Sequence, residues 1–499
     1  MQRYSQFIFA IFILAILVYP LLKGVITFQI AVWDEARYAV NAIEMMHSRN
    51  PLVVTFDGQP DWWNSKPPMA VWLQAISMKT LGINEIALRL PSVLATIGCF
   101  LLLLFFTKRI ANSYFPGLVA ALALASSLGM IRRHVALTAD VDALFTFFIL
   151  AYSLSFLSLL LLNPEKKNSY WAVFSITLTC AFLCKGIAAF IPLPGLVIVT
   201  LLSKKTKALL TTRQFYFSIL VIVVVFFGYY LVREQFDNGY IKAVLRGEIG
   251  FYANGGYNKN RPFLFYFNNI TNEYFYPLAA TMPICFVLGF FTKNKIINRA
   301  IFFTFIFCLT FILIHSFSKN GNEWYDAPVY PFLCLVFGFA VYILFFELAA
   351  PLFNKVTPRL RTIIIGIFVT GILYYPYSKV LTHINENKNI IYHLEREGAF
   401  MRHLNKIKFP IKDYTVCMKG GVVDPVKFYK ESLNRHSGYS IKITNTLDFK
   451  PGQVVLVGQT DNIFHIIDHY DCNIIKAWDN SRLFKINSIK KDAKQTLYY

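Results

Sequence analysis

The sequence predicts a polytopic α-helical membrane protein of about eleven spans with a small soluble α/β domain at its C-terminal end. Hydrophobic residues make up 56% of the 499 residues, and the mean hydropathy is +0.47, well above that of a soluble fold of this size. Apolar runs recur through residues 1–380, whereas residues 381–499 alternate between short apolar and polar stretches. We therefore expect a membrane domain, residues 1–380, and a soluble domain, residues 381–499.

Eleven apolar runs are the expected spans, although several are shorter than the ~20 residues that a bilayer core requires. They are residues 7–22, 90–107, 115–131, 143–162, 170–184, 187–202, 215–232, 276–291, 300–317, 329–346 and 362–378. No small-residue cleavage site follows the first run, so we expect this run to remain in the mature protein.

Lys and Arg are segregated into alternate loops, such as those around Lys108, Lys204 and Lys293, which contain almost no acid. The positive-inside bias places these loops in the cytoplasm and predicts a multi-pass protein of the plasma (bacterial inner) membrane. The other segments then lie outside: residues 23–89, 132–142, 233–275, 318–328 and the tail after 378. The net charge of +21 reflects this topology and contact with anionic lipid, so no nucleic-acid partner is expected.

The first outer loop is expected to carry two amphipathic helices, over residues 35–47 and 68–80. Trp62 and Trp63 lie between them, either at the level of the lipid headgroups or as a surface on which substrate stacks. Residues 233–275 are expected to form a flap over a membrane-facing cavity.

The tail is expected to begin with a helix over residues 386–406 and to continue with short strands. Two of the eight cysteines, Cys417 and Cys472, fall in this tail. In an oxidising compartment they either pair or stay free, and the sequence leaves both alternatives open. Most of the other cysteines fall in apolar spans, where a buried cysteine acts as a small hydrophobic residue.

Two acidic residues, Asp34 and Glu35, follow the first span directly. They are either interfacial charges and helix caps or reactive carboxylates. Lys66 lies in the same loop, and the two prolines after it fix the backbone that presents it. A lysine held in this way can bind an anionic head group as a point charge. We therefore interpret Asp34 as a catalytic base.

Polar residues also gather at the outer ends of later spans. Asp140 and Asp142 precede an apolar helix, close to the Arg-Arg-His cluster of residues 132–134, and a helix cap is the alternative for Asp142. Lys185 ends the fifth span on the outer side, where it either binds an anion or snorkels to the interface. A transporter would place such charges in mid-span rather than at helix ends.

Further hydrogen-bond donors come from late segments of the chain. Arg261 lies in the expected flap, and Lys319 and Tyr325 precede a late span that contains prolines. These side chains are suited to hold phosphate oxygens. Together with Lys66, they would bring positive charge from separated segments toward Asp34.

Six motifs occur in order along the outer segments. They are Asp34-Glu35-x-Arg37-Tyr38, Lys66-Pro67-Pro68, Arg89-Leu90-Pro91-Ser92, Asp142 at the start of the fourth span, Lys185-Gly186, and Ser318-Lys319 with Tyr325 and Pro328. Over roughly residues 1–380 this order resembles the GT-C membrane glycosyltransferases. The likeness is greatest to the aminoarabinose transferases of lipid A and more distant to the protein O-mannosyltransferases.

The resemblance implies a role for each matching position. It implies Asp34 as the essential acid, Lys66 as the phosphate-binding lysine and Tyr325 as a further phosphate contact, with Arg261 as a looser match. We add Glu35 and Asp142 to the catalytic set as positioning residues, and Lys319 to the ligands of the donor phosphate. Residues that would position donor or acceptor are Arg37, Tyr38, Trp63, Asp140 and Lys185.

The resemblance does not extend to a metal site. Ser65 stands where the aminoarabinose transferases carry a Glu that helps to bind a metal, and no His stands near Tyr257, where a further ligand would be expected. We therefore expect no metal ligand and no required cofactor, with a bound divalent metal as the alternative.

The expected function is transfer of a hexose or pentose from a polyprenyl-phosphate donor to a lipid, glycan or protein acceptor, as in lipid A modification of the cell envelope. Asp34 would remove the acceptor proton in a single inverting displacement, while cations stabilise the phosphate. Two alternatives are a transporter or flippase for a lipid-linked or anionic solute, and an assembly module whose tail docks partners. If residues 385–499 were deleted, an enzyme core would keep some transfer and a docking protein would not.

Overall fold

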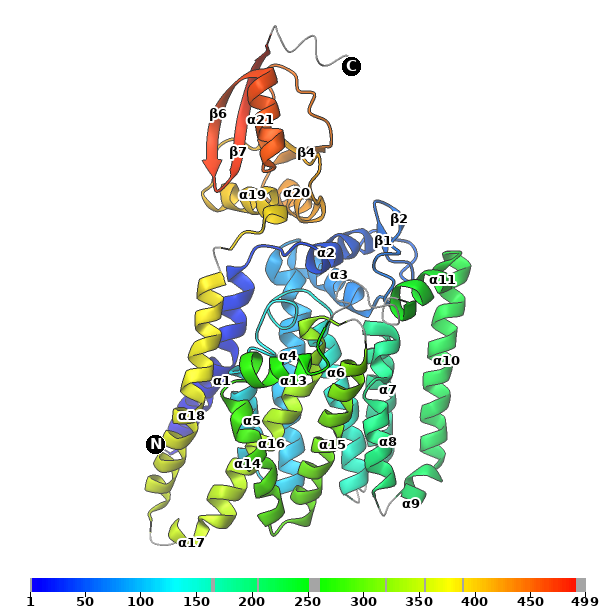
Figure 1. The fold of residues 1–499 in the computed structure, drawn as a ribbon, viewed down its shortest axis with the longest axis vertical. Helices are drawn as coiled ribbons and strands as arrows, with labels where there is room; N and C mark the ends of the chain where they lie inside the picture. The colour runs from blue at the N-terminus through cyan, green and yellow to red at the C-terminus, as the bar shows by residue number, and fades with distance from the viewer. Residues whose placement is uncertain are drawn as a thin grey trace.

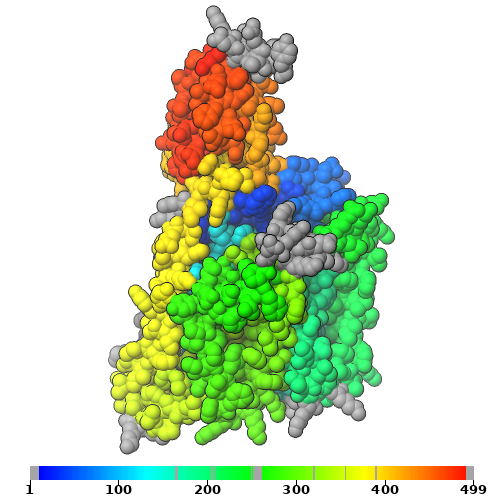
Figure 2. All heavy atoms as spheres, viewed as in Figure 1, coloured from blue at the N-terminus to red at the C-terminus, as the bar shows by residue number. Residues whose placement is uncertain are grey.

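The structure is a computed structural model, and it describes residues 2–162, 167–203, 206–250, 261–318, 321–353, 356–387 and 390–490. A bundle of long helices carries a smaller mixed domain on one end (Figure 1). We call this end of the bundle the domain end. The loop of residues 28–84, here called the first loop, lies between the bundle and the C-terminal domain, as the space-filling view also shows (Figure 2).

In the described part of the chain, seven helical segments are long and apolar enough to cross a membrane. They are α4 (Glu85–Ala111), α6 (Asp142–Leu161), α7 (Lys167–Lys185) with η1 (Gly186–Phe190), α10 (Arg213–Phe236), α15 (Lys295–Phe317), η4 (Glu323–Val329) with α16 (Tyr330–Tyr342) and η5 (Ile343–Leu348), and α18 (Pro358–Asn387). An eighth span results if two segments bent by 106° are counted as one, namely α13 (Phe265–Asn268) with η3 (Asn269–Tyr274), and α14 (Leu278–Phe291).

Each of the eleven expected apolar runs overlaps a helical element, although the helix within the run 115–131 already ends at Ala125. Four of the runs fall outside the seven full spans. These four are the apolar part of α1 (Gln2–Thr27), α5 (Phe115–Ala125), α8 (Leu193–Leu201) and α14. The run 187–202 is divided into η1 and α8 around Pro192 and Pro194, because proline cannot donate a helical hydrogen bond. The sequence therefore predicts where apolar helices lie better than it predicts their lengths.

The centre of the bundle is formed by α5, α6 and α16. The apolar window of α6 is 89% buried, whereas that of α10 is 11% buried, so α10 faces outward. Helices α5 and α16 approach closely at Gly338, where a Cβ would lie 2.1 Å from the carbonyl oxygen of Pro116. Small residues permit such contacts between spans. This packed centre fixes both ends of the segment that joins α5 to α6, residues 126–141, which we call the α5–α6 loop.

The first loop contains the two expected helices, α2 (Asp34–Met45) and α3 (Met69–Leu81), with the hairpin β1 (Thr55–Phe56) and β2 (Gln59–Pro60) between them. Helix α2 packs against α3 and against α20 (Asp424–His436) of the C-terminal domain, which explains why most of its residues are buried. Short helices elsewhere are α9 (Thr206–Leu210), α11 (Tyr240–Val244), η2 (Leu245–Gly250) and α17 (Ala350–Phe353). Residues 251–260 of the expected flap lie outside the described residues.

The C-terminal domain contains a five-stranded mixed sheet in the order β4-β3-β5-β7-β6. Strand β3 (Asp413–Cys417) pairs in parallel with β4 (Ser440–Thr444) and β5 (Val454–Val457), while β7 (Ser481–Ile489) is antiparallel to β5 and β6 (Tyr470–Trp478). Its helices are η6 (His393–Glu395), α19 (Arg396–Lys406), α20 and α21 (Thr460–His469). The expected helix 386–406 is wrong as one element, since α18 ends at Asn387 and a new helix begins at Arg396.

The two cysteines of this domain do not pair. Cys417 lies on β3 and Cys472 on β6, and strands β5 and β7 separate them in the sheet. Both are free, and Cys417 is buried. The sheet order therefore decides the alternative that the sequence left open.

Candidate active site

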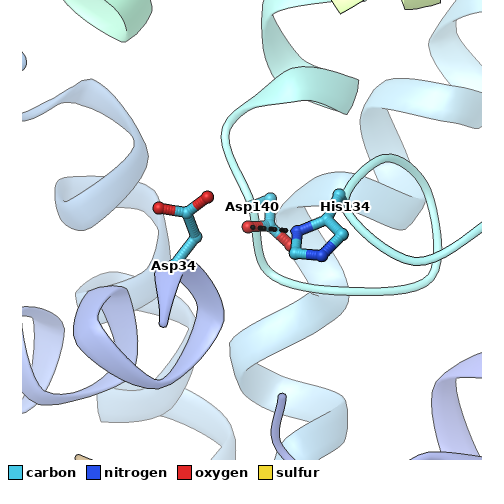
Figure 3. Close-up of side chains that lie close together, drawn as sticks. All are labelled: Asp34, His134 and Asp140. Carbon is cyan, nitrogen blue, oxygen red and sulfur yellow. Dashed lines mark ion pairs between the residues drawn. The ribbon is translucent and has the colours of Figure 1, made fainter. Parts of the chain in front are cut away.

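Asp34 lies in a compact acidic and basic group at the domain end. It is the first residue of α2, and its carboxylate faces His134 and Asp140 of the α5–α6 loop (Figure 3). One ligand-type atom from each of the three side chains lies within 4.8 Å of the others. His134 Nδ1 is 3.5 Å from Asp140 Oδ1. The first loop and the α5–α6 loop thus meet at this group.

The backbone is in the left-handed region at two residues, one within this group and one next to it. Trp33, directly before Asp34, has a φ of 70°, and His134 has a φ of 65°. For residues other than glycine such conformations cost about 1–3 kcal/mol each and persist only where the surroundings enforce them. One restraint is local, because the hydroxyl of Thr138 accepts a hydrogen bond from His134 N at 2.8 Å and donates one to Asp140. Strained backbone at two of these positions fits a functional site.

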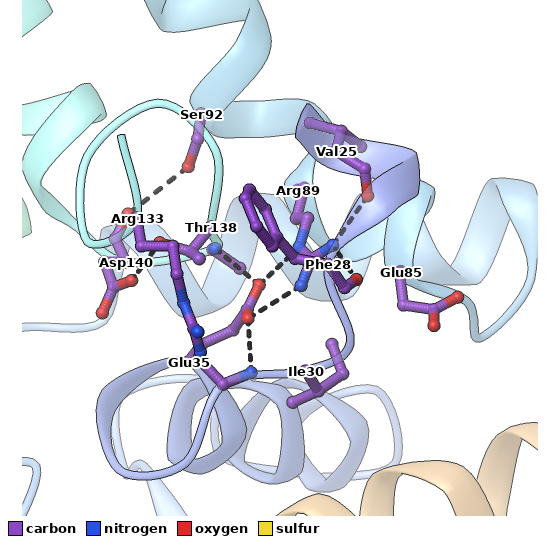
Figure 4. A network of polar contacts seen from close by, with 12 residues as sticks. Val25, Phe28, Ile30, Glu35, Glu85, Arg89, Ser92, Arg133, Thr138 and Asp140 are labelled. Atoms are coloured by element: carbon purple, nitrogen blue, oxygen red, sulfur yellow. Dashed lines mark hydrogen bonds and ion pairs between the residues drawn. The ribbon is translucent and has the colours of Figure 1, made fainter. Parts of the chain in front are cut away.

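Glu35 supports this group from the bundle side. Its carboxylate pairs with Arg89, with Nε–Oε1 at 2.6 Å and Nη2–Oε2 at 2.9 Å, and neither side chain is exposed (Figure 4). It also accepts hydrogen bonds from Ala31 N at 2.8 Å and from Ala139 N at 2.9 Å. Glu35 therefore joins the two loops from inside the protein. The sequence-based placement of Glu35 in the catalytic set is corrected to a structural role, because its oxygens are already bonded within the protein.

The ionisation of Asp34 is suited to proton transfer. Burial raises the pKa of Asp34 and the nearby Asp140 raises it further, while Lys66 and His134 partly oppose this, so the pKa lies above its ordinary value. Burial lowers the pKa of His134, but the carboxylates of Asp140 and Asp34 outweigh it and raise that pKa. Asp34 is thus the carboxylate of the group whose proton affinity is increased.

Positive charge also acts on Asp34. Lys66 is half-buried in the first loop, and its charge acts on Asp34 and on Asp142. Lys185, at the end of α7, is 2.5 Å from Asp142 at the start of α6, and both are buried. The Lys185 ammonium also lies 4.4 Å from the ring centroid of Tyr325. Asp142 therefore balances the charge of Lys185 rather than capping its helix, and Lys66, Lys185 and Tyr325 belong to one end of the bundle.

The remaining phosphate candidates are less direct. Arg261 donates hydrogen bonds to the carbonyls of His315 and Ser318, each at 2.7 Å, and stacks on Tyr266. It therefore holds the end of α15, next to the segment that carries Tyr325. Lys319 lies outside the described residues.

The residues expected to position substrate have separate surroundings. Arg37 forms a bidentate pair with Asp61, at 2.7 and 2.8 Å, and its guanidinium lies 3.4 Å from the ring centroid of Phe56, so it braces the first loop rather than Asp34. Tyr38 is buried; burial raises its pKa well above the usual value, and the Asp34 carboxylate contributes to this shift. Trp63 is 51% exposed, which leaves both of its sequence-based interpretations open.

A cavity of about 990 Å³ opens beside the Asp34 group. Trp33 and His134 line it together with residues from four other segments. Arg132 and Arg133 line it next to His134, and the four other segments contribute Arg261, Glu273, Tyr274, Trp324, His383, Tyr392 and Glu395. His134 stacks on Trp324 with ring centroids 4.0 Å apart. The cavity is large enough for a polar head group and is bounded on one side by the start of the C-terminal domain.

His134 and Trp33 were not singled out as site residues by the sequence. The Arg-Arg-His cluster marked the right region, but nothing in its spacing indicates that His134 turns toward Asp34. That orientation depends on the left-handed backbone at His134 and on the seven-residue return to Asp140, which are set by tertiary contacts. A short loop with His, Thr and Asp between two apolar helices was the available signal.

The same group provides three potential metal ligands. Asp34, His134 and Asp140 each offer one atom at mutual distances that a single cation could bridge. The sequence-based argument against a metal considered Ser65 and Tyr257, which are different positions. A divalent cation held here would add positive charge near a donor phosphate. Among the described residues, His134 Nδ1 and Asp140 Oδ1, which lie 3.5 Å apart, are both buried without a hydrogen-bond partner.

The family model for dolichyl-phosphate-mannose-protein mannosyltransferases matches residues 65–230. An uncharacterized protein of Aquifex aeolicus (strain VF5) is 29% identical over 316 residues, which are 61% of this chain and 59% of that protein. The undecaprenyl phosphate-alpha-4-amino-4-deoxy-L-arabinose arabinosyl transferase of Shewanella sediminis (strain HAW-EB3) is 30% identical over 171 residues, 33% of this chain and 30% of the relative. The chain thus matches less than two thirds of the length of each of these relatives.

The fold is shared over nearly the whole chain. ArnT from Cupriavidus metallidurans bound to undecaprenyl phosphate superposes with a TM-score of 0.66 at 13% identity, covering 95% of this chain and 97% of ArnT. Its apo form gives a TM-score of 0.67 at 12% identity, covering 96% and 98%. The chain therefore has the GT-C fold of membrane glycosyltransferases, and the expected resemblance to the aminoarabinose transferases and protein O-mannosyltransferases is confirmed.

Proposed function

We propose that this protein is an integral membrane glycosyltransferase that moves a sugar from a polyprenyl-phosphate donor to a hydroxyl of a lipid, glycan or protein acceptor. In this proposal the domain end of the bundle faces the outside of the plasma membrane. The observation that carries the proposal is the placement of a half-buried carboxylate of raised pKa, Asp34, beside a cavity of about 990 Å³ and near the charge of Lys66, with the ion pair of Lys185 and Asp142 at the same end of the bundle. The structural likeness to an ArnT that binds undecaprenyl phosphate supports a donor of the same class.

The reaction is a single displacement at the anomeric carbon. The acceptor oxygen forms a bond to that carbon as the bond to the phosphate oxygen breaks, so the phosphate leaves as the polyprenyl monoester. Asp34 takes the proton of the attacking hydroxyl. Because the hydroxyl attacks from the face opposite the leaving phosphate, the configuration at the anomeric carbon is inverted. His134 and Asp140 orient the Asp34 carboxylate, and the raised pKa of Asp34 improves it as a base.

Stabilisation of the leaving phosphate is assigned to cations on the bundle side. Lys66 and Lys185 carry the positive charge, and the hydroxyl of Tyr325 is a further donor near Lys185. The ion pair with Asp142 offsets part of the cost of burying the Lys185 ammonium. Because a phosphate monoester is already a good leaving group, these cations replace the need for a general acid.

The alternative of a transporter or flippase receives less support from these positions. Asp34, Asp142 and Lys185 stand at the ends of α2, α6 and α7, all at the domain end of the bundle. A pathway across the membrane requires polar groups along the interior of the spans. Likewise, a docking role for the C-terminal domain alone would not explain why the charged side chains of Asp142 and Lys185 are buried in the bundle.

The experiment that tests the proposal is transfer of radiolabelled sugar from polyprenyl phosphate by the purified full-length protein, with hexose and aminopentose donors compared. Lys66→Met should raise the donor KM by about 10- to 100-fold, since a charge-assisted hydrogen bond to phosphate contributes about 1.5–3 kcal/mol. Lys79→Met is the matched control, because Lys79 is an exposed lysine of the same loop, and it should behave as wild type. Movement of labelled lipid across vesicles without sugar transfer would contradict the proposal and favour a flippase.

Metal dependence is a separate prediction. We expect transfer to survive exhaustive dialysis against EDTA, because Lys66 acts on Asp34 and the raised pKa of His134 favours a proton where a cation would bind. The measurement is the transfer rate before and after dialysis, followed by addition of Mn²⁺, Mg²⁺ or Zn²⁺. A loss that one of these ions reverses in wild type, but not in His134→Gln, would place a cation on the Asp34 group instead.

A further inference from the structure

Glu395 lies where the C-terminal domain begins, and it contacts the two segments that carry Asp34 and His134. It belongs to η6, directly before α19, and is 1% exposed. Its Oε1 accepts hydrogen bonds from Val32 N at 3.0 Å and from Arg133 Nη2 at 2.9 Å. Its Oε2 accepts one from Gln29 Nε2 at 2.9 Å. A single buried carboxylate of the C-terminal domain thus binds three donors of the membrane domain.

The donors that Glu395 binds are neighbours of the residues that face the proposed reaction. Val32 is followed by Trp33 and then by Asp34, and Arg133 is followed by His134. The residue after each of these two donors has a left-handed backbone. Glu395 therefore restrains the first loop and the α5–α6 loop at the two points where the backbone is strained.

A second carboxylate holds the same loops from the opposite direction. Glu35 binds Ala31 N and Ala139 N from the bundle side, whereas Glu395 binds Val32 N and Arg133 from the domain side. Consecutive backbone N–H groups of the first loop are thus held by carboxylates from two domains. Tyr429 of α20 adds a further contact, because its hydroxyl accepts a hydrogen bond from Ile30 N at 3.0 Å. Removing either carboxylate therefore takes away part of the restraint on the segment that presents Asp34.

Glu395 also lines the cavity beside the group. Tyr392, His393 and Leu394 of the same linker line it too, together with Trp33 and His134. The wall of the cavity is therefore completed by the start of the C-terminal domain, not by the membrane domain alone.

We propose that Glu395 is a positioning residue, through which the C-terminal domain holds Asp34 and His134 in their reactive arrangement. The catalytic consequence rests on the proposed function, whereas the structural consequence does not. Glu395 touches neither reacting atom; it acts through Val32 and Arg133. The C-terminal domain is then part of the active site rather than an appended module.

Other contacts between the two domains provide a matched control. Arg402 of α19 donates to Glu85 Oε1 at 2.7 Å and to the carbonyls of Thr27 at 3.2 Å and Ile26 at 2.9 Å. Like Glu395, Arg402 connects the start of the C-terminal domain to the membrane domain by charge-assisted hydrogen bonds. Unlike Glu395, its partners are at the end of α1 and the start of α4, away from residues 32–34 and 132–134. Loss of Arg402 should weaken docking without loosening the two loops.

The test compares Glu395→Ala, Arg402→Ala and wild type in the full-length protein, by hydrogen exchange and by transfer kinetics. In Glu395→Ala, exchange of residues 29–36 and 132–140 should rise by about tenfold or more, as expected for local loosening. Its kcat should fall by about 100-fold with little change in donor KM, because a displacement of the reactive groups by about 1 Å has effects of that size. Arg402→Ala should leave both loops protected and kcat near that of wild type.

Unchanged exchange of the two loops in Glu395→Ala would overturn the inference, as would equal losses of kcat in Glu395→Ala and Arg402→Ala. If Glu395→Ala does not fold, Glu395→Gln decides by the same criteria, since the amide keeps the side-chain volume but loses the charge that Arg133 pairs with. Arg133→Ala should not add to the kcat loss of Glu395→Ala, since both remove one interaction. If wild type transfers no sugar, the proposed function fails. The exchange result then still tests whether Glu395 restrains the first loop and the α5–α6 loop.

Discussion

Replacing Glu35 by Ala is expected to lower the free energy of unfolding by about 3–5 kcal/mol, because the change leaves the Arg89 guanidinium buried without its carboxylate. Both side chains are fully buried, and Arg89 bonds in addition to the carbonyls of Val25, Phe28 and Gln29. The loss also frees Ala31 N and Ala139 N, which connect the first loop to the α5–α6 loop. Chemical unfolding in mild detergent measures the effect.

A control for this prediction is available on the surface of the C-terminal domain. Glu431 pairs with Arg435 one turn later on α20, and both side chains are partly exposed. Glu431→Ala should therefore change the stability by less than about 1 kcal/mol. A Glu35→Ala protein as stable as Glu431→Ala would contradict the structural role of Glu35. A Glu35→Gln protein that unfolds like wild type but transfers no sugar would return Glu35 to the catalytic set.

The second large effect concerns Asp34 and depends on its ionisation. Asp34 acts as a base only when its carboxylate is deprotonated, so activity should be present above its pKa and lost as the pH falls through it. Because burial and Asp140 raise that pKa, the loss should occur at a higher pH than an exposed aspartate would give. The ascending limb of the kcat profile measures this position. A profile that stays flat down to the range of an ordinary aspartate would argue against Asp34 as the base.

Continuous runs of apolar residues predicted the membrane-spanning part of the fold, because burial in lipid and burial in the bundle both require apolar side chains. The central α6 and the outward-facing α10 are recognised equally well, although one is almost fully buried in the protein and the other is not. The lengths of α5 and α8 were not predictable in the same way. Where each helix ends depends on local proline positions and on packing against neighbours.

Adjacent acidic residues show where sequence reasoning about the site stops. Asp34 and Glu35 are consecutive on α2, and successive helical residues point in different directions, about 100° apart. Asp34 faces His134 and the cavity side, while Glu35 points to Arg89 in the interior. The sequence identified the acidic pair. Which of the two carboxylates faces His134 and which faces Arg89 depends on how α2 is rotated about its axis in the folded protein.

Long-range pairings account for the other residues that the sequence could not supply. Arg133 and Glu395 are separated by 262 residues, and neither belongs to a motif that names the other. The sequence predicted a soluble C-terminal unit, and it also suggested that an enzyme core would keep some transfer without residues 385–499. Because Glu395 bonds to Val32 and Arg133, that expectation no longer follows. Deletion of residues 385–499 would remove one wall of the cavity and one of the two carboxylates that hold the first loop.

The measurement that bears most directly on the catalytic role of Asp34 is the rate of sugar transfer by Asp34→Asn at saturating donor, at a pH well above the pKa of Asp34. Asn has nearly the same shape but cannot accept the proton, so kcat should fall by about 10²–10⁴-fold while donor KM and unfolding stay close to wild type. A kcat near the wild-type value would contradict the account and require a different base.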